Sequence, residues 1–375
     1  MRIAVNTRFL LSSKMEGFGY YTYEVVKRLV EEHQEHEFIL FFDRKFDEKF
    51  VFGENVTPVI LNPPARHPFL FYIWFEFSVK RALKKYKADV FISPDGYLSL
   101  KSKVKQIAVI HDVNFEHNPE DVPWLMRKYL RRFFPKFAHK ATHILTVSEY
   151  SKQDICSTYK IDTAKVTALW NGASPKFKPL SLDQKTMVRS TYTRGNPFLL
   201  FVGALHPRKN LGRLIRSFEQ FKRSNSKDQH KLVIVGAELF GGKLGEIEIS
   251  SFIREHIILT GHVSLSDLAD IMGAASIFTY VPYFEGFGIP LVEAMKCGTP
   301  ILSGDRTSLP EVAGDAAIYC DPFSIEDISE KMSILANSSS IREELSRKGL
   351  KRSKLFSWDS TSNEIWSIIC SIVEQ

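Results

Sequence analysis

Residues 276–302 read SIFTYVPYFEGFGIPLVEAMKCGTPIL. An apolar run ends at Tyr280, a glycine-containing turn follows, and a helical pattern begins near Ile289. Pro290 suits the first turn of that helix, where the N–H group that proline lacks has no partner in any case. A second short apolar run follows at 300–302. This order of strand, helix and strand predicts parallel strands joined by a crossover helix.

The same alternation runs through both halves of the chain. In the first half we expect strands at 2–8, 37–42, 58–61, 89–92, 106–110 and 143–147, and helices at 20–32, 70–86, 124–138 and 150–159. In the second half we expect strands at 198–202, 232–235, 257–259, 277–280, 300–302 and 316–319, and helices at 210–221, 244–254, 265–274, 289–296 and 325–335. Since 375 residues suit two domains rather than one, we predict an α/β protein of two doubly wound, Rossmann-like domains that face each other across a cleft.

The domain boundaries follow from composition. Residues 172–196 carry two prolines and many polar residues, which is typical of an interdomain connection. We therefore predict a first domain at 1–175 and a second at 176–356. The tail at 357–375 has the pattern of an apolar helix, and such a helix needs a surface to cover. The pattern alone allows it to pack on its own domain or to cross back to the first.

Composition limits the class of protein. Hydrophobic residues make up 44% and charged residues 25% of the chain, the balance of a globular protein. The net charge of +7 is compatible with nucleic acid, an anionic membrane surface or phosphorylated small molecules as partners. The four cysteines suggest neither a disulfide framework nor a metal site, and no segment reaches the ~20 apolar residues of a membrane span. We expect a cytoplasmic protein.

Two carboxylates flank the glycine turn of the opening stretch. Glu285 precedes Gly286, Phe287 and Gly288, and Glu293 falls in the first turn of the helix that follows. Free backbone N–H groups and the helix dipole favour a phosphate at such a turn. Both carboxylates can accept hydrogen bonds from the hydroxyl groups of a sugar or ribose. The alternative is that Glu293 only complements the helix dipole and that Glu285 lies on the surface.

Three further segments carry candidate site residues. In FVGALHPRKNL (201–211), Arg208 and Lys209 follow a predicted strand, where adjacent cations suit a diphosphate. In IAVIHDVN (107–114), His111 follows a strand and could bond a sugar or transfer a proton; a purely structural histidine is the alternative. Gly17 and Gly19, in the turn 16–22, allow a phosphate to approach, but their distance from the preceding strand argues against a nicotinamide fingerprint.

Two segments combine aromatic or apolar residues with many cations. Residues 63–87 could dock on an anionic bilayer, although core packing of an aromatic helix with a basic outer face is the favoured reading. The basic run 127–140 is open to the same two readings. Neither segment carries a nucleic-acid-binding motif, so we do not expect a nucleic-acid partner.

Taken together, the chain resembles the family 4 retaining glycosyltransferases of the GT-B fold. The resemblance covers nearly the whole chain and rests on the glycine turn at Gly17 and Gly19, IHDV (110–113), VSEYSK (147–152), WNGAS (170–174), PRKN (207–210), EGFGIPLVE (285–293), LPEVAGDAA (309–317) and FSW (356–358). The FSW tail resembles the helix with which this family crosses back to the first domain. The overall pattern is similar to bacterial mannosyltransferases of surface-polysaccharide assembly.

The resemblance implies roles for the residues that match. The catalytic group would consist of His111, Arg208, Lys209 and Glu285. The nucleotide sugar would be bound by Gly17, Gly19, Gly203, Gly286, Phe287, Gly288, Ile289 and Glu293. The first domain would bind the acceptor and the second the donor. One position departs from the pattern, because many relatives carry arginine after the strand-end glycine where this chain has Ala204. Arg208 and Lys209 would then supply the positive charge for the donor diphosphate.

The resemblance also implies reactants. GDP-mannose is the first expectation for the donor and a UDP-sugar the second, without a cofactor or a bound metal. A saccharide or a polyprenyl-linked saccharide would be the acceptor, with peripheral contact to the inner face of the cytoplasmic membrane. Alternatives from other classes are a phosphorylase or epimerase on the same fold and a non-catalytic sugar-nucleotide-binding protein. A phosphorylase of this kind would need a lysine that binds pyridoxal phosphate.

Overall fold

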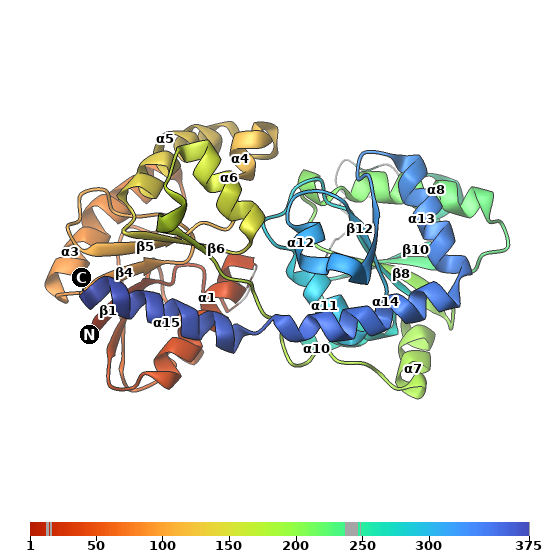
Figure 1. Cartoon of the computed structure of the whole chain (residues 1–375), viewed down its shortest axis with the longest axis horizontal. Helices are drawn as coiled ribbons and strands as arrows, with labels where there is room; N and C mark the ends of the chain where they lie inside the picture. Colours follow the sequence, from red (N-terminus) through yellow and green to blue (C-terminus); the bar gives the residue numbers. More distant parts are fainter. Residues whose placement is uncertain (13–14, 16, 237–246, 248, 375) are drawn as a thin grey trace. The chain divides into compact units, whose positions relative to one another are not determined.

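The chain folds into two units of similar size in the computed structural model (Figure 1), which describes residues 1–12, 15, 17–236, 247 and 249–374. The first unit consists of Met1–Asn171 and Ser357–Gln375, and the second consists of Gly172–Phe356. Each unit is built around one parallel sheet. The predicted α/β class of two doubly wound domains is therefore confirmed.

The first unit has a seven-stranded sheet in the order β3-β2-β1-β4-β5-β6-β7. Its strands are β1 (Arg2–Asn6), β2 (Glu37–Phe42), β3 (Val56–Ile60), β4 (Val90–Ser93), β5 (Lys105–Val109), β6 (His143–Thr146) and β7 (Val166–Ala168). Its helices are α1 (Gly17–Glu32), α2 (Pro68–Ile73), α3 (Lys80–Lys85), α4 (Asn114–His117), α5 (Trp124–Lys140), α6 (Glu149–Tyr159) and α15 (Trp358–Glu374). Figure 1 shows α5 and α6 over one face of the sheet and α1 and α15 over the other. The sequence patterns predicted six of these strands but not the three-residue β7.

The second unit has a six-stranded sheet in the order β10-β9-β8-β11-β12-β13. Its strands are β8 (Phe198–Val202), β9 (Lys231–Val235), β10 (Ile257–Gly261), β11 (Ile277–Tyr280), β12 (Ile301–Gly304) and β13 (Ala317–Cys320). Its helices are α7 (Leu182–Thr193), α8 (Leu211–Ser224), α9 (Ser251–Arg254), α10 (Leu265–Ala274), α11 (Ile289–Cys297), α12 (Leu309–Ala313), α13 (Ile325–Asn337) and α14 (Ser339–Arg352). Residues 244–246 and 248 of the helix predicted at 244–254 lie outside the described residues. The part that the structure describes is helical at Ser251–Arg254.

The predicted interdomain connection at 172–196 contains a helix that was not predicted. Residues Leu182–Thr193 form α7, and Ser181 caps this helix. The Ser181 side chain accepts from the backbone of Gln184, and the Gln184 side chain accepts from the backbone of Ser181. This reciprocal capping box stabilises a helix start within a polar stretch. α7 then packs against α10 as part of the second unit.

The C-terminal helix α15 crosses back to the first unit, as its resemblance to the family's tail predicted. It packs along α1, with Ile365 and Ile369 buried. The Trp366 ring stacks on that of His33, with 3.6 Å between ring centroids. Lys105 of β5 donates a hydrogen bond to the carbonyl oxygen of Ile372. Burial of its apolar face makes α15 an integral part of the first unit's core.

The aromatic segment at 63–87 supplies core residues to the first unit. Phe71, Trp74 and Phe75 are buried among the sheet residues. Two helical segments, α2 and α3, are joined here through a π-helical stretch, Trp74–Val79. The buried carboxylate of Glu76 in this stretch accepts hydrogen bonds from the backbone of Leu100. The favoured reading, core packing, is therefore the one that the structure shows for these aromatic rings.

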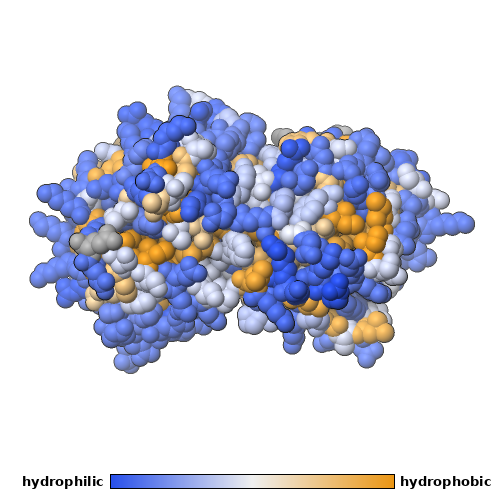
Figure 2. Space-filling model, viewed as in Figure 1, coloured by the Kyte–Doolittle hydropathy of each residue, from blue (hydrophilic) through white to orange (hydrophobic). Residues whose placement is uncertain are grey.

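Within the described residues, no helix is both long and apolar enough to cross a bilayer. On the face shown in Figure 2, hydrophilic residues predominate over both units, and apolar residues form scattered patches.

Candidate functional site

The carboxyl ends of β8 and β11 bring two of the predicted segments together in the second unit. These strands are neighbours in the sheet, and they end at Val202 and Tyr280. The loop with Arg208 and Lys209 and the loop with Glu285 therefore leave the same edge of the sheet. This is the edge at which open α/β sheets bind their ligands.

Glu285 joins both cations of the first loop in one cluster. Its Oε1 accepts a hydrogen bond of 2.8 Å from Nη1 of Arg208 and one of 2.5 Å from Nζ of Lys209. Lys209 Nζ also donates to the hydroxyl oxygen of Tyr280 at 2.8 Å. Arg208 is tied to the same loop by a bond of 3.3 Å from Nη1 to the carbonyl oxygen of Phe284. Two cations thus share one carboxylate.

The cations decide the charge state of Glu285. Burial by itself would raise the pKa of this carboxyl, which is only 7% exposed, but Arg208 and Lys209 hold the pKa below its ordinary value. Glu285 is therefore an ionised hydrogen-bond acceptor at neutral pH. Burial, followed by the charge of Glu285, raises the pKa of Tyr280 well above its ordinary value, so this phenol stays neutral.

The glycine turn is fixed by residues that the sequence did not single out as site residues. Ser308 Oγ donates to the carbonyl oxygens of Glu285 and Phe287, at 3.0 and 3.1 Å. Thr307 Oγ1 accepts from the Glu285 backbone at 3.2 Å. Gly288 has a φ of 95°, a conformation that favours glycine, and a Cβ there would lie 3.2 Å from a Leu309 methyl group. The segment beginning at Ser308 therefore holds the turn that presents Glu285.

Glu293 is the fifth residue of α11, beyond the first helical turn in which it was predicted, and it is also 7% exposed. Burial raises its pKa to about 8, and the opposing effect of Lys296 is smaller. Among the described residues, none forms a hydrogen bond with this carboxyl. It is consequently protonated at neutral pH in the ligand-free chain, and it can both donate to and accept from a hydroxyl-bearing ligand.

The remaining candidate residues of the second unit differ in which of their groups a ligand could contact. Phe287 is buried and its ring packs edge-on against Phe356, with 5.8 Å between centroids. It can therefore offer a ligand only its backbone. Ile289 begins α11, whose N-terminus has no side-chain cap, and Gly286 belongs to the turn before it. A Cβ at Gly203 would lie 3.8 Å from Cδ of Lys209, so this glycine sits beside the charged cluster.

In the first unit, His111 follows β5 and packs against α1, which begins at Gly17; the predicted glycine turn is therefore the start of this helix. Its ring lies edge-on to those of Phe18 and Tyr21, at 4.8 Å from each centroid. Its Nε2 lies 2.8 Å from the carbonyl oxygen of Pro94, which requires a proton on Nε2. Burial lowers the pKa of His111, although Pro94 opposes the shift. A neutral ring with this tautomer presents Nδ1 as an acceptor.

The two glycines around Phe18 have different surroundings. A Cβ on Gly19 would lie only 2.6 Å from the carbonyl oxygen of Phe9, so this position admits no side chain without movement of the backbone. A Cβ on Gly17 would have no described atom within 4 Å outside its chain neighbours and its own helix. Gly19 therefore serves close packing, and the described residues show no such constraint at Gly17. Residue 16, the first of the predicted turn, lies outside the described residues.

Sequence reasoning missed a buried ion pair at the carboxyl ends of β1 and β4. Arg8 Nε lies 2.6 Å from Oδ2 of Asp95. Asn6 Nδ2 donates to the other oxygen of Asp95 at 2.9 Å. The Arg8 guanidinium also lies 4.5 Å from the ring centroid of Tyr97. The only signal in the sequence was a charged residue at the end of an apolar strand.

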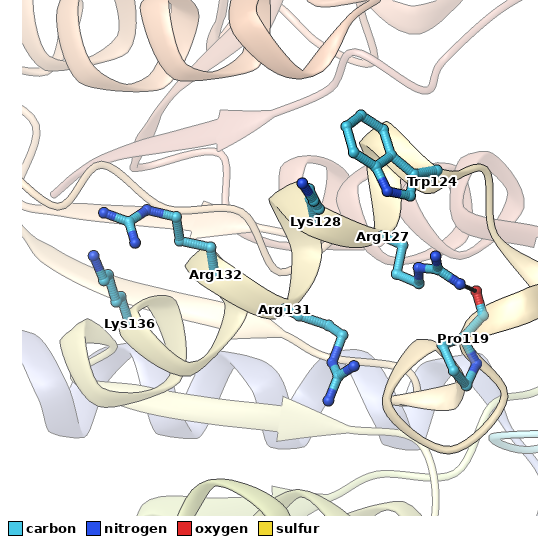
Figure 3. Close-up of a pocket in the computed structure, with 7 residues that line it drawn as sticks. All are labelled: Pro119, Trp124, Arg127, Lys128, Arg131, Arg132 and Lys136. Carbon is cyan, nitrogen blue, oxygen red and sulfur yellow. Dashed lines mark hydrogen bonds between the residues drawn. The ribbon is translucent and has the colours of Figure 1, made fainter.

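A basic hollow of about 590 Å³ lies on α5, in the segment 127–140 that had been left open between two readings. Figure 3 shows the residues that line it, Pro119, Trp124, Arg127, Lys128, Arg131, Arg132 and Lys136. Lys128 Nζ lies 4.0 Å from the ring centroid of Trp124, which is 58% exposed. Arg131 is partly neutralised by Glu116 at 2.9 Å. The outer face of α5 thus combines cations with an exposed indole.

Comparison with known protein families agrees with this arrangement. The model of glycosyltransferase family 4 matches residues 15–177, and the model of glycosyl transferases group 1 matches residues 184–352. The chain belongs to this family of two-domain glycosyltransferases. Each of the two models falls almost entirely within one of the two sheet-containing units.

Individual relatives point the same way. The glycosyltransferase is 27% identical over 362 residues to O-antigen chain mannosyltransferase B of Escherichia coli, covering 93% of this chain and 94% of the relative. It is 23% identical to the O-antigen chain mannosyltransferase RfbU of Salmonella typhimurium, with 80% of each chain covered. Mannosyl transfer in O-antigen synthesis is thus the named activity of these relatives.

Solved structures confirm the fold as GT-B. Sucrose-phosphate synthase from Thermosynechococcus elongatus matches with a TM-score of 0.80 at 15% identity, over 99% of this chain and 98% of that one. WaaG, a glycosyltransferase of lipopolysaccharide biosynthesis, matches with a TM-score of 0.75 at 17% identity, over 98% of this chain and 99% of that one. At these identities the likeness is one of fold.

Proposed function

We propose that this glycosyltransferase transfers mannose from GDP-mannose, with retention of the anomeric configuration, to a saccharide or lipid-linked saccharide during surface-polysaccharide assembly. The observation that carries the proposal is the cluster in which Arg208 and Lys209 share the carboxylate of Glu285. The choice of mannose rests on the relatives, which are named as O-antigen mannosyltransferases.

The charged cluster suits a nucleotide diphosphate. Arg208 and Lys209 are both half-buried, where electrostatic attraction is stronger than in water. Arg208 can hold two phosphate oxygens through its planar fork, and Lys209 acts as a compact charge. Both cations would stabilise the negative charge that develops on the leaving diphosphate. Glu293, the fifth residue of α11, would bond the hydroxyls of the ribose.

Retention follows from the proposed role of Glu285. Its carboxylate is held by two cations, which suits a group that orients the donor sugar better than one that attacks the anomeric carbon. The acceptor hydroxyl would then attack from the face that the diphosphate leaves. The bond from the anomeric carbon to the diphosphate oxygen breaks, the bond to the acceptor oxygen forms, and the acceptor proton passes to the departing diphosphate. These bond changes and the proton transfer balance without a cofactor or a metal ion.

The first unit would receive the acceptor. The neutral His111 ring, next to the turn that carries Gly17, can accept a hydrogen bond at Nδ1 from a sugar hydroxyl. On α5, exposed Trp124 and the row of cations suit the interface of an anionic bilayer, where aromatic rings insert and cations attract lipid phosphates. We therefore place the chain in the cytoplasm, in peripheral contact with the inner membrane face, where a polyprenyl-linked acceptor would lie.

The decisive test has two stages. Thermal unfolding is first measured with GDP, UDP and ADP at matched concentrations; a nucleotide at 100 times its Kd should stabilise the fold by about 2.7 kcal/mol. The sugar nucleotides of the stabilising base are then assayed for transfer, and NMR of the product gives its anomeric configuration. Stabilisation by GDP, with an α-linked product from GDP-mannose, supports the proposal. Stabilisation by UDP alone would mean that the donor is a UDP-sugar and not GDP-mannose. Nucleotide binding without sugar transfer would indicate a non-catalytic binding protein.

A further inference from the structure

A second basic hollow lies in the second unit at the amino ends of its strands. It has a volume of about 630 Å³. Its floor includes Pro197, His230, Ser276 and Pro300, which directly precede β8, β9, β11 and β12. Parallel strands place their amino and carboxyl ends at opposite edges of the sheet. The hollow is therefore on the other edge from Arg208, Lys209 and Glu285, and the proposed donor site does not account for it.

Four cations on two helices surround this hollow. Lys185 and Arg189 come from α7, one turn apart, and Arg342 and Arg347 come from α14. Glu343, which is exposed, is the only acidic residue among the described residues that line it. In the part of the chain that the structure describes, none of the four cations has a carboxylate within ion-pair distance. An unbalanced charge of this kind suits an anionic ligand.

The two central guanidinium groups are held in place by backbone carbonyls. Arg189 Nε donates to Ala274 at the end of α10, at 3.0 Å. Arg342 Nη1 donates to the last turn of α13, with a distance of 2.8 Å to Ala336. A guanidinium has five N–H groups, so each arginine keeps donors for a ligand after making these bonds. The bonds fix where those donors lie, which lowers the entropy lost on binding.

The cations that line the hollow lie close enough to lower one another's pKa. Burial and then the charge of Arg189 lower the pKa of Lys185. Burial and then the charge of Arg342 lower the pKa of Arg189. Repulsion between neighbouring cations is thus the second cause of each shift, after burial. A bound anion would remove this repulsion.

We infer that this hollow is a second anion site, which binds a small molecule carrying a diphosphate or phosphate monoester through Lys185, Arg189, Arg342 and Arg347. The volume falls within the range of about 300–1,000 Å³ that is usual for small-molecule sites. Two guanidinium forks are suited to phosphate oxygens in a way that scattered surface lysines are not. The site is separate from the chemistry proposed for the donor, and it does not depend on that proposal.

The test uses inorganic pyrophosphate as the probe and the full chain with Lys209→Ala, which disables the proposed donor site. Binding is measured by calorimetry in metal-free buffer. To this chain we add either Lys185→Ala with Arg347→Ala, or the charge-matched control Lys227→Ala with Lys354→Ala, two exposed cations that do not line the hollow. Neither the Lys185 nor the Arg347 side chain makes a hydrogen bond to another described residue, so the double variant in the hollow should fold.

We expect the Lys209→Ala chain to bind pyrophosphate. The variants in the hollow should weaken this binding at least about tenfold, the scale of lost charge-assisted hydrogen bonds, and the control should weaken it less than about twofold. No binding to the Lys209→Ala chain, or equal weakening by both double variants, would overturn the inference. Pyrophosphate binding, and not sugar transfer, is the readout of this test, because every variant in it carries Lys209→Ala. The proposed donor site is tested separately, by the effect of Lys209→Ala alone on sugar transfer.

Discussion

Lys209 Nζ lies 2.5 Å from Oε1 of Glu285, although 75 residues separate the two in the sequence. The contact exists because β8 and β11 are neighbours and both residues lie on loops that leave their carboxyl ends. A half-buried ammonium group held this firmly is already oriented for an anion before that anion arrives. Preorganisation of this kind is the main source of electrostatic catalysis.

The first prediction concerns that ammonium group. Lys209→Ala should lower the turnover of sugar transfer at least ~100-fold, because removal of one preorganised charge stabiliser has effects of this size. Initial rates at saturating donor separate turnover from KM. The matched control is Lys227→Ala, which removes an exposed lysine of the same unit. Near-normal turnover in Lys209→Ala would show that this lysine does not stabilise the leaving group.

The elements that the sequence predicted well are those whose signal is local. The strands at 37–42, 198–202 and 277–280 are apolar runs bounded by turn residues, and the structure has them at the same residues. α7 was missed because the prolines and polar residues before it outweighed its capping box, which was also readable in the sequence. β7 was missed because a strand of three residues has no periodicity.

The candidate site shows the same division. Arg208, Lys209 and Glu285 could be placed together from the sequence, because each follows a predicted strand and parallel strands end at one edge. Ser308, which fixes the glycine turn through two hydrogen bonds, could not be assigned a role. The same holds for the pairing of Arg8 with Asp95. These contacts depend on how distant segments pack, and no local pattern encodes that.

The second prediction is a pH dependence of stability due to Glu293. Burial raises its pKa from 4.5 to about 8, so between these values the folded chain keeps a proton that the unfolded chain loses. Stability from this group is therefore greatest at low pH and falls as pH rises towards 8, after which it is constant. Glu293→Gln removes the effect. Its free energy of unfolding relative to wild type should rise by more than about 1 kcal/mol between pH 6 and pH 9.

Urea unfolding of both proteins at the two pH values provides the measurement. Glu330→Gln is the matched control, because Glu330 is exposed and its pairing with Lys331 at 3.7 Å is weak. Its relative stability should not change with pH. If Glu293→Gln likewise shows no change, the carboxyl of Glu293 is ionised in the folded chain and the assignment is wrong.

The third prediction separates packing from ligand binding at the two glycines that begin α1. Gly19→Ala places a methyl group 2.6 Å from a backbone oxygen, and overpacking of this kind costs about 1–3 kcal/mol. Gly17→Ala meets no atom of the described residues within 4 Å outside its chain neighbours and its own helix, so stability should change by less than about 0.5 kcal/mol. If Gly17 also lines the phosphate side of the donor, its variant should lose transfer activity while it keeps its Tm. Equal loss of Tm in both variants would contradict the packing difference.

The last prediction concerns α15. Ile369 is fully buried against the first unit, and Ile369→Ala should destabilise that unit by about 2–5 kcal/mol. Asp359 bonds Arg28 at 2.6 Å but its side chain is 71% exposed, so Asp359→Ala should cost no more than about 1 kcal/mol. Amide hydrogen exchange distinguishes the units, because local stability appears as protection of individual strands.

In Ile369→Ala, β1 should exchange faster while β8 keeps its protection. The reason is that α15 packs on α1, next to the sheet that contains β1, whereas β8 has its own core in the second unit. In Asp359→Ala, both strands should exchange as in wild type. Faster exchange in β8 without a change in β1 would show that the tail belongs to the second unit, which is the reading that the sequence pattern by itself had left open.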